Sequence, residues 1–209
     1  MNKLQKLWHY IVRPRFSRFL LSLMHNGYLL EIGWYDTLFK KTPIDKEKKP
    51  IPWTTYSYIE FIKSYLKSNM TLFEYGSGNS TLFYADYVRQ LISVEHDNKW
   101  YSKIKSLIPG HCNLIFSDVT SEEYICPDEL KNNKFDVIII DGRRRNECIV
   151  KSEPSLKDNG IMVLDDSERA HYAEGIDFLT DKGYKKIDFW GIAPMYFHNK
   201  CTTVFYKTL

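Results

Sequence analysis

The sequence has little cysteine, and its four cysteines are widely spaced. Cys112, Cys126, Cys148 and Cys201 include no Cys-x-x-Cys pair. Neither a zinc site nor the disulfide framework of a small secreted protein is indicated, because both need cysteines at characteristic short spacings. We therefore expect reduced thiols and a cytoplasmic protein.

The sequence also lacks a strong excess of one charge and a long apolar run. In 209 residues, 29 Lys and Arg stand against 26 Asp and Glu, a net charge of +3. This excess is too small to indicate a nucleic-acid partner, whose phosphates require many basic contacts. The apolar stretch from Phe19 to Ile32 contains His25 and Asn26 and is too short for a transmembrane helix. With 44% hydrophobic residues, the chain can bury an ordinary core.

The N-terminal region has the pattern of a basic amphipathic helix, because basic and apolar residues interleave at helical spacing before the first acid, Glu31. The basic residues are Lys3, Lys6, Arg13, Arg15 and Arg18, and the apolar ones include Leu4, Leu7, Trp8, Ile11, Val12, Phe16, Phe19, Leu20 and Leu23. Arginines interrupt the apolar run and no small-residue cleavage site follows, so we expect no signal peptide. Two interpretations stay open: the apolar stripe packs on the body of the protein, or it attaches the protein to a membrane surface.

A stretch rich in proline and charge follows at residues 36–53, where Pro43, Pro50 and Pro52 flank the charged segment Asp45–Lys49. We predict a loop there. The chain is thereby divided into an N-terminal helical extension and loop, residues 1–52, and a larger domain, residues 53–209.

From residue 54 onward, helical and strand patterns alternate. Strands are predicted over residues 70–75, 91–95, 113–117, 135–140 and 160–164, with helices between them and a further helix over 167–181. Alternation of this kind requires crossovers, and right-handed crossovers between buried parallel strands produce a Rossmann-like, doubly wound α/β sheet. The last two strands, 184–190 and 202–206, are joined by a loop too short for a crossover helix, so we expect them to pair antiparallel.

Polar residues follow every predicted parallel strand, at the edge of the sheet where ligands bind in such folds. They are Glu74-Tyr75-Gly76-Ser77-Gly78-Asn79-Ser80-Thr81, Glu95, Asp118, Asp141-Gly142-Arg143-Arg144-Arg145 and Asp165-Asp166-Ser167-Glu168-Arg169. Gly76 and Gly78 permit a tight turn and a close approach of a ligand to the backbone. Glu95 ends the second strand, where an acid can accept hydrogen bonds from ribose hydroxyls. Asp118 and Asp166 are equally compatible with helix N-caps.

These features indicate a nucleotide or nucleoside cofactor. The third glycine of the dinucleotide fingerprint is absent, its place being near Thr81, which weakens the case for a nicotinamide cofactor. Tyr101 and Lys105 have a dehydrogenase-like spacing but lie too early in the fold, so we interpret them as a solvated helix face.

On these residues, the region from Trp53 to Leu209 resembles the class I S-adenosylmethionine-dependent methyltransferases, including a bacterial branch of methyltransferase-like proteins. In this family a sheet of parallel strands ends in an antiparallel hairpin. The resemblance implies that Glu74, Gly76 and Gly78 hold the methionyl part of the cofactor and that Glu95 binds the ribose. It also implies that Ser117 and Asp118 lie near the adenine. The cofactor-binding residues expected on this basis are Glu74, Tyr75, Gly76, Ser77, Gly78, Ser80, Glu95, His96, Ser117, Asp118 and Asp141.

The Asp-Gly after the fourth strand and the Asp-Asp after the fifth are similar to those of magnesium-dependent O-methyltransferases that modify sugars and catechols. The implied acceptor is a hydroxyl of a small polar molecule, such as a sugar, which the enzyme must hold against the methyl group and deprotonate. The candidate catalytic residues are Asp141, Arg143, Asp165, Asp166 and His171. The aspartates either bind Mg²⁺ or, neutralised by Arg143 or Arg169, leave Asp141 or His171 as the base. Arg143 can also hold an anionic group of the acceptor.

Two other functions stay open. One is a different enzyme on the same fold, such as an aminopropyltransferase or a nucleotide-dependent oxidoreductase, and the other is a non-catalytic S-adenosylmethionine-binding module at a membrane. Acids at all five strand ends favour catalysis. We further expect the N-terminal helix and loop to cover the acceptor side of the site as a lid.

Overall fold

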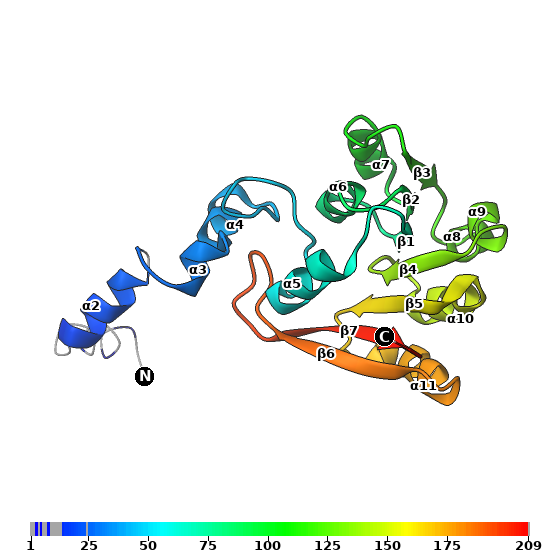
Figure 1. The fold of residues 1–209 in the computed structure, drawn as a ribbon. Coiled ribbons are helices and arrows are strands. Elements are labelled where there is room, and N and C mark those ends of the chain that lie inside the picture. Colours follow the sequence, from blue (N-terminus) through cyan, green and yellow to red (C-terminus); the bar gives the residue numbers. More distant parts are fainter. Residues whose placement is uncertain (1–2, 4, 6–7, 9–13, 24, 209) are drawn as a thin grey trace.

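The computed structural model describes residues 3, 5, 8, 14–23 and 25–208. A seven-stranded sheet of order β3-β2-β1-β4-β5-β7-β6 forms its centre (Figure 1). The strands are β1 (Thr71–Tyr75), β2 (Gln90–Glu95), β3 (Cys112–Phe116), β4 (Phe135–Ile140), β5 (Leu156–Asp165), β6 (Lys185–Gly191) and β7 (Lys200–Tyr206). The first five pair in parallel, and β7 pairs antiparallel with β5 and β6. The predicted doubly wound sheet with its C-terminal antiparallel hairpin is therefore confirmed.

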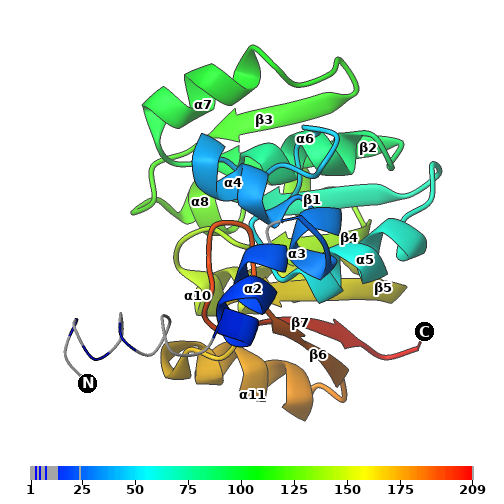
Figure 2. The same cartoon turned by 90° about the vertical axis from the view of Figure 1, so that its left-hand side faces the viewer.

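Helices connect the strands and cover both faces of the sheet (Figures 1 and 2). They include α5 (Tyr56–Tyr65), α6 (Asn79–Ala85), α7 (Asn98–Lys105), α8 (Glu122–Ile125), α9 (Asp128–Lys131), α10 (Arg145–Ser152) and α11 (Ala173–Asp181), with 3₁₀ turns η1 (Glu153–Ser155) and η2 (Ala170–Tyr172). Because successive residues of a strand point to opposite faces, Phe73 and Tyr75 join the core under α8 to α11, whereas Leu72 joins the core under α5 and α6. The apolar segment Val137–Ile140 is buried throughout, as a strand covered on both faces requires.

The N-terminal extension holds more helix than the sequence predicts. It contains α2 (Pro14–Ser22), α3 (Tyr28–Glu31) and α4 (Trp34–Lys40), so the expectation of a loop over residues 36–53 is wrong as far as Lys40. Trp34 and Thr37 are buried on α4, and this packing stabilises a helix that the polar pattern alone does not indicate. Lys41 ends the helix in the left-handed conformation.

The second half of the extension is fastened beside the loop between β6 and β7. The indole N–H of Trp34 donates to the carbonyl oxygens of Ala193 (3.2 Å) and Tyr196 (3.0 Å). Trp34 and Ile51 both belong to the core on the α5–α6 face. Whether residues 1–52 form a separate unit stays a prediction, although these two side chains share a core with the larger domain.

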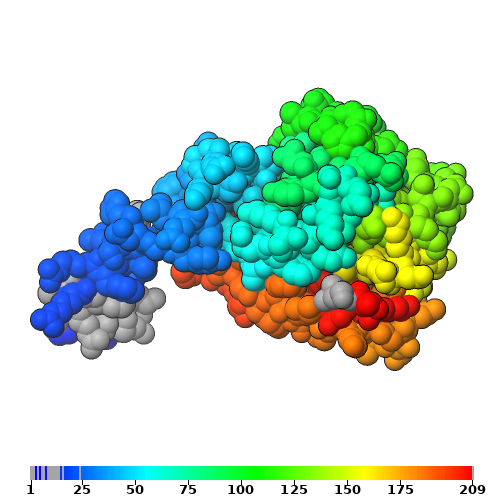
Figure 3. Space-filling view, viewed as in Figure 1, coloured from blue at the N-terminus to red at the C-terminus, as the bar shows by residue number. Residues whose placement is uncertain are grey.

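The first half of the extension leads away from the sheet (Figures 1 and 3). Phe19 and Leu21 on α2 are 57% and 61% exposed. Residues 4, 6, 7 and 9–13 of the predicted basic helix lie outside the described residues. Within the described ranges, no helix combines the length and apolar character needed to cross a bilayer.

The segment after β5 differs from the single helix expected over residues 167–181. Asp166 adopts a φ of 54°, and the backbone N–H of Ser167 donates to the carbonyl oxygen of Cys201 in β7 (3.0 Å). This tie to β7 holds residues 166–169 in a turn. The chain then enters η2, and α11 begins only at Ala173.

Candidate functional site

The loop between β1 and α6 lies at the carboxyl edge of the sheet, against the end of β4. Gly76 has a φ of +87°, and a Cβ atom there would lie 3.2 Å from the carbonyl oxygen of Asp141. The Gly76 N–H donates to the carbonyl oxygen of Val94 at the end of β2 (2.9 Å). Glycine is required at this position by both its backbone conformation and the close approach of β4.

Glu74 is completely buried beneath this loop. Its carboxylate accepts hydrogen bonds from the hydroxyls of Ser80 (2.5 Å), Thr81 (2.6 Å) and Ser93 (3.0 Å). Burial raises the pKa of Glu74 to about 7, although these three hydrogen bonds oppose the rise. Both carboxylate oxygens are engaged within the chain, so the geometry makes Glu74 a support of the loop. Its direct contact with a cofactor stays a prediction.

Glu95 holds the same loop from the side of β2. One oxygen accepts from the backbone N–H and the hydroxyl of Ser77 (both 2.9 Å), and the other accepts from the backbone N–H groups of His96 and Asp97 (both 2.8 Å). The His96 Nδ1 atom lies 3.1 Å from Glu95 Oε1. A carboxylate can accept about four hydrogen bonds. Glu95 accepts four, two from the glycine loop and two from the residues that follow β2.

Trp100 closes the other side of the glycine loop. Its indole N–H donates to the carbonyl oxygen of Ser77 (2.5 Å), and a Cβ atom on Gly78 would lie 3.6 Å from its ring. Asp97 caps α7 by accepting from the Trp100 backbone N–H (2.8 Å). The loop is thus held from below by Glu74 and at its sides by Glu95 and Trp100.

The other predicted cofactor residues lie in different surroundings. Tyr75 is buried, and its hydroxyl donates to the carbonyl oxygen of Ile125 (2.6 Å), so its side chain points into the core. Ser117 is buried, with its hydroxyl 3.1 Å from that of Ser121. Asp118 is exposed, and its pKa is lowered by hydrogen bonds from the side chain and backbone of Thr120. A position of Ser117 and Asp118 near adenine stays a prediction.

A cleft of about 710 Å³ opens over the ends of β1, β2 and β4. It is lined by Gly76, Ser77, Glu95, His96, Asp97, Lys99, Trp100, Lys103, Asp141, Gly142, Arg143 and Arg145. This volume is within the range of small-molecule and cofactor sites. The structure therefore brings the glycine loop, Glu95 and Asp141 together at the predicted edge, and no described residue of the N-terminal extension lines the cleft.

Two of the three predicted acidic residues are buried with a lysine. Lys200 Nζ lies 3.1 Å from Asp165 and 2.6 Å from Asp166. Asp165 also accepts from the Thr202 hydroxyl (2.8 Å), and Asp166 pairs with Arg169 (2.8 Å). Desolvation lowers the pKa of Lys200, but the charges of the two aspartates outweigh it and raise that pKa above its ordinary value. The lysine therefore remains a cation and compensates the buried carboxylates.

Asp141, the third aspartate, faces the cleft. Its carboxylate pairs with the buried Arg145 (2.9 Å), which also donates to the carbonyl oxygen of Gly142 (3.0 Å). Burial raises the pKa of Asp141, and the charge of Asp165 adds to the rise, while Arg145 and Lys200 oppose it. The side chain of Asp141 is 26% exposed, against 3% for Asp165 and 7% for Asp166. Asp141 is thus the aspartate that a ligand in the cleft can reach.

These contacts do not fit a Mg²⁺ site made from the three aspartates. The oxygens of Asp165 and Asp166 are engaged with Lys200, Thr202 and Arg169, whereas Mg²⁺ requires oxygen ligands in near-octahedral geometry. In the part of the chain that the structure describes, no group of three His, Cys, Asp or Glu side chains is placed to hold a metal ion. The aspartates are neutralised by basic side chains: Lys200 pairs with Asp165 and Asp166, and Arg145 pairs with Asp141. Arg169, one of the two arginines expected to neutralise this cluster, pairs with Asp166.

The two remaining catalytic candidates occupy different positions. Arg143 is exposed at the rim of the cleft, where its backbone N–H donates to the hydroxyl of Tyr124 (2.8 Å). His171 is exposed on η2, with its ring centroid 4.0 Å from that of Tyr172, and does not line the cleft. Arg143 and Asp141 therefore line the same cleft, whereas His171 does not line it.

Sequence reasoning missed three residues of this region. Lys200 stands in β7 without any motif, Arg145 could have been found from its position four residues after Asp141, and Tyr124 lies on α8. A Cβ atom on Gly142 would lie 2.2 Å from the Tyr124 hydroxyl oxygen, so Gly142 is needed for this contact.

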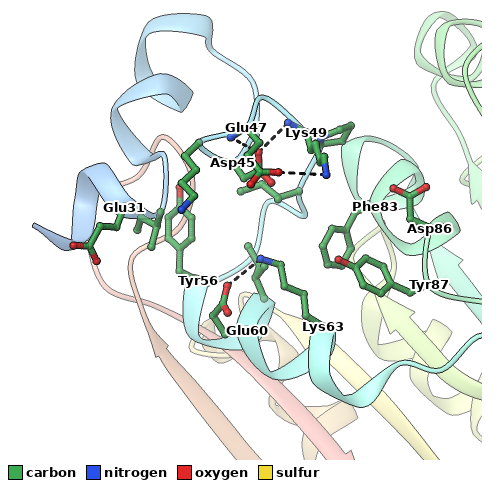
Figure 4. A pocket seen from close by; sticks show the side chains of 15 residues that line it. Glu31, Asp45, Glu47, Lys49, Tyr56, Glu60, Lys63, Phe83, Asp86 and Tyr87 are labelled. Atoms are coloured by element: carbon green, nitrogen blue, oxygen red, sulfur yellow. Dashed lines mark hydrogen bonds and ion pairs between the residues drawn. The ribbon is translucent and has the colours of Figure 1, made fainter.

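A second cavity, of about 390 Å³, lies between the loop of residues 45–51, α5 and α6 (Figure 4). Four of its charged side chains form ion pairs, Lys63 with Glu60 (3.0 Å) and Lys49 with Glu47 (3.3 Å). The strand ends do not contribute to it, and none of the predicted site residues lines it.

Comparisons with known proteins support the fold. A scan of protein-family models and a search of curated proteins give no match, whereas many solved structures match. A precorrin-6y C5,15-methyltransferase from Geobacter metallireducens has a TM-score of 0.56 at 15% identity, covering 80% of this chain and 98% of that one. A proposed caffeoyl-CoA O-methyltransferase from Staphylococcus aureus has a TM-score of 0.57 at 12% identity, covering 90% and 97%. A proposed methyltransferase from Streptococcus mutans, solved in complex with SAH, has a TM-score of 0.51 at 11% identity, covering 70% and 93%. The chain has the fold of the class I S-adenosylmethionine-dependent methyltransferases, as the resemblance implies.

The raised pKa of Glu74 predicts a pH-dependent stability. Between pH of about 4.5 and about 7, the folded protein retains a proton on Glu74 that the unfolded chain has released. The free energy of unfolding of the wild type should therefore fall with rising pH relative to that of Glu74→Gln, by up to about 3 kcal/mol. Urea unfolding of both proteins across this range measures the difference, and a difference that does not change with pH contradicts the assignment.

The buried pairing of Lys200 predicts a large loss of stability on its removal. Lys200→Met leaves two buried carboxylates without their shared cation and should lower the free energy of unfolding by about 3 to 5 kcal/mol at neutral pH. Lys186→Met is the matched control, because Lys186 pairs with Asp188 at 2.8 Å on the neighbouring strand but is 48% exposed. The control should lose less than about 1 kcal/mol. Equal losses in chemical unfolding would show that burial of the Lys200 pairs is not what stabilises this edge.

Proposed function

We propose that this protein is a methyltransferase that transfers the methyl group of S-adenosylmethionine to a hydroxyl of a small polar acceptor, with sugars as the first class to test. The observation that carries the proposal is the cleft at the carboxyl edge. There a glycine loop braced by Glu74 and Glu95 faces Asp141. Similarity in fold to proteins described as O-methyltransferases supports the same reading.

The cleft suits a cationic nucleoside ligand. When bound, S-adenosylmethionine supplies a methyl group on a positively charged sulfur, and the carboxylates of Glu95, Asp97 and Asp141 line the cleft. A ribose hydroxyl can reach Glu95 by replacing the Ser77 hydroxyl, because this exchange leaves every backbone N–H on that carboxylate paired.

Asp141 is the residue we assign as general base. It reaches the cleft, and the rise of its pKa brings its proton affinity closer to what a base needs near neutral pH. Arg145 holds the carboxylate in place through its ion pair, and the exposed Arg143 at the rim is positioned to hold an anionic group of an acceptor. Asp165 and Asp166 act only through the charge network beneath Asp141.

Cofactor binding is the first test. Isothermal titration calorimetry should show one S-adenosylmethionine per chain, and Glu95→Gln should weaken the affinity by about 5- to 150-fold, since a charged acceptor for ribose hydroxyls is worth about 1 to 3 kcal/mol. Glu123→Gln, at an exposed acid outside the cleft, should bind as the wild type does. Tighter binding of NAD would indicate an oxidoreductase, and preference for the decarboxylated cofactor an aminopropyltransferase. Unchanged affinity in Glu95→Gln would contradict the assignment of Glu95 as the ribose-binding residue.

Removal of the base should separate catalysis from binding. With radiolabelled cofactor at a saturating concentration and a panel of sugars and other polar metabolites, Asp141→Asn should still bind the cofactor, more weakly because one carboxylate of the cleft is neutralised, but should lower turnover by about 100-fold or more. Wild-type turnover should rise with pH through the raised pKa of Asp141, because the carboxylate must be ionised to accept a proton. Asp177→Asn, exposed on α11, serves as the control. A variant as active as the wild type excludes Asp141 as the base.

A further inference from the structure

Exposed apolar side chains are concentrated in the N-terminal extension. Of the fourteen large hydrophobic side chains that are exposed in the described residues, seven lie within residues 1–52, a quarter of the chain. They are Trp8, Phe19, Leu21, Tyr28, Leu30, Leu38 and Phe39. Phe197 of the β6–β7 loop, 71% exposed, contacts Trp34 at the base of the same region. Single exposed apolar residues are ordinary, but such a concentration marks an interaction surface.

The charge of the extension is equally uneven. Residues 1–52 contain ten Lys and Arg against four Asp and Glu, whereas the remainder of the chain contains 19 against 22. The small net charge of the whole chain therefore conceals a basic extension on a slightly acidic body. No acid precedes Glu31.

The position of the extension leaves this surface available. α2 projects from the body in the space-filling view (Figure 3), whereas Leu29 of α3 and the adjacent Ile32 pack against the core on the α5–α6 face. Phe39, on the part that does rest there, is 80% exposed. The apolar residues of the extension thus have no described partner sufficient to bury them.

We propose that the extension docks this protein on an anionic lipid bilayer. Basic residues near a membrane contribute about 1 kcal/mol each in attraction to anionic headgroups, and aromatic and leucine side chains enter the interface. Residues 1–23 contain five Lys and Arg, no acid, and the exposed apolar side chains of Trp8, Phe19 and Leu21. This combination matches an anionic membrane surface better than it matches a second copy of the chain. A second copy would bring like charges together. The proposal is independent of methyl transfer.

Vesicle flotation of the purified 209-residue protein tests the proposal. Vesicles containing phosphatidylglycerol should carry the protein to the top of the gradient, vesicles of phosphatidylcholine alone should not, and added salt should reduce the bound fraction. Phe19→Ser/Leu21→Ser should lower the partition coefficient by about tenfold or more without changing charge, since two apolar side chains no longer enter the interface. Leu107→Ser/Phe116→Ser removes two apolar side chains that are 54% and 46% exposed on the body, and should float as the wild type does.

A second pair of variants tests the charge. Lys3→Gln/Arg15→Gln should reduce flotation with anionic vesicles, whereas Lys105→Gln/Lys151→Gln, on α7 and α10 of the body, should not. Circular dichroism and thermal unfolding check that each variant is folded. Equal flotation with both lipids, no flotation, or self-association in sedimentation that Phe19→Ser/Leu21→Ser abolishes would each overturn the proposal, the last in favour of a second copy of the chain.

Discussion

Compensation of buried carboxylates is the constraint on which the carboxyl edge of this sheet depends. An unpaired carboxylate loses several kcal/mol of hydration on burial, yet β1, β2 and β5 each carry a buried acid at or next to their last residue. The chain meets this cost in three ways. Glu74 is surrounded by hydroxyls, Glu95 by backbone N–H groups of two loops, and Asp165 and Asp166 by Lys200.

Each means of compensation also positions a part of the site. The hydroxyls that donate to Glu74 come from α6 and β2. These hydrogen bonds fix the start of α6 against β2 and so orient the glycine loop that joins β1 to α6. Lys200 opens β7, so compensation of Asp165 ties the C-terminal hairpin to the strand ends. The loop of that hairpin accepts the Trp34 hydrogen bonds that fasten the extension. Asp141 is left as the partly exposed acid over the cleft, and its reactivity depends on how fully its neighbours are neutralised.

The fold could be predicted because its signals are local and repeated. Helical and strand patterns alternate along the sequence, turn residues follow each strand, and the connection before β7 is short. All three signals predict the same topology, which the structure confirms. Of the candidate site, only the acids and glycines at the strand ends could be predicted from the sequence. Lys200 could not be predicted, because the role of a single lysine at the start of a buried strand depends on the antiparallel pairing of β7 with β5. For the same reason α4 and the turn at Asp166 escaped prediction: tertiary contacts of Trp34 and Ser167 override the local pattern there.

The central claim is that the cleft over Ser77 binds the adenosyl cofactor, and a crystal structure with S-adenosylhomocysteine tests it most directly. The account predicts density for the ligand along the glycine loop, with the ribose hydroxyls on Glu95 in place of the Ser77 hydroxyl and the homocysteine part directed to Asp141. Density in the cavity between residues 45–51 and α5, or an unchanged Glu95 with all four internal hydrogen bonds beside a ligand bound elsewhere, would contradict it.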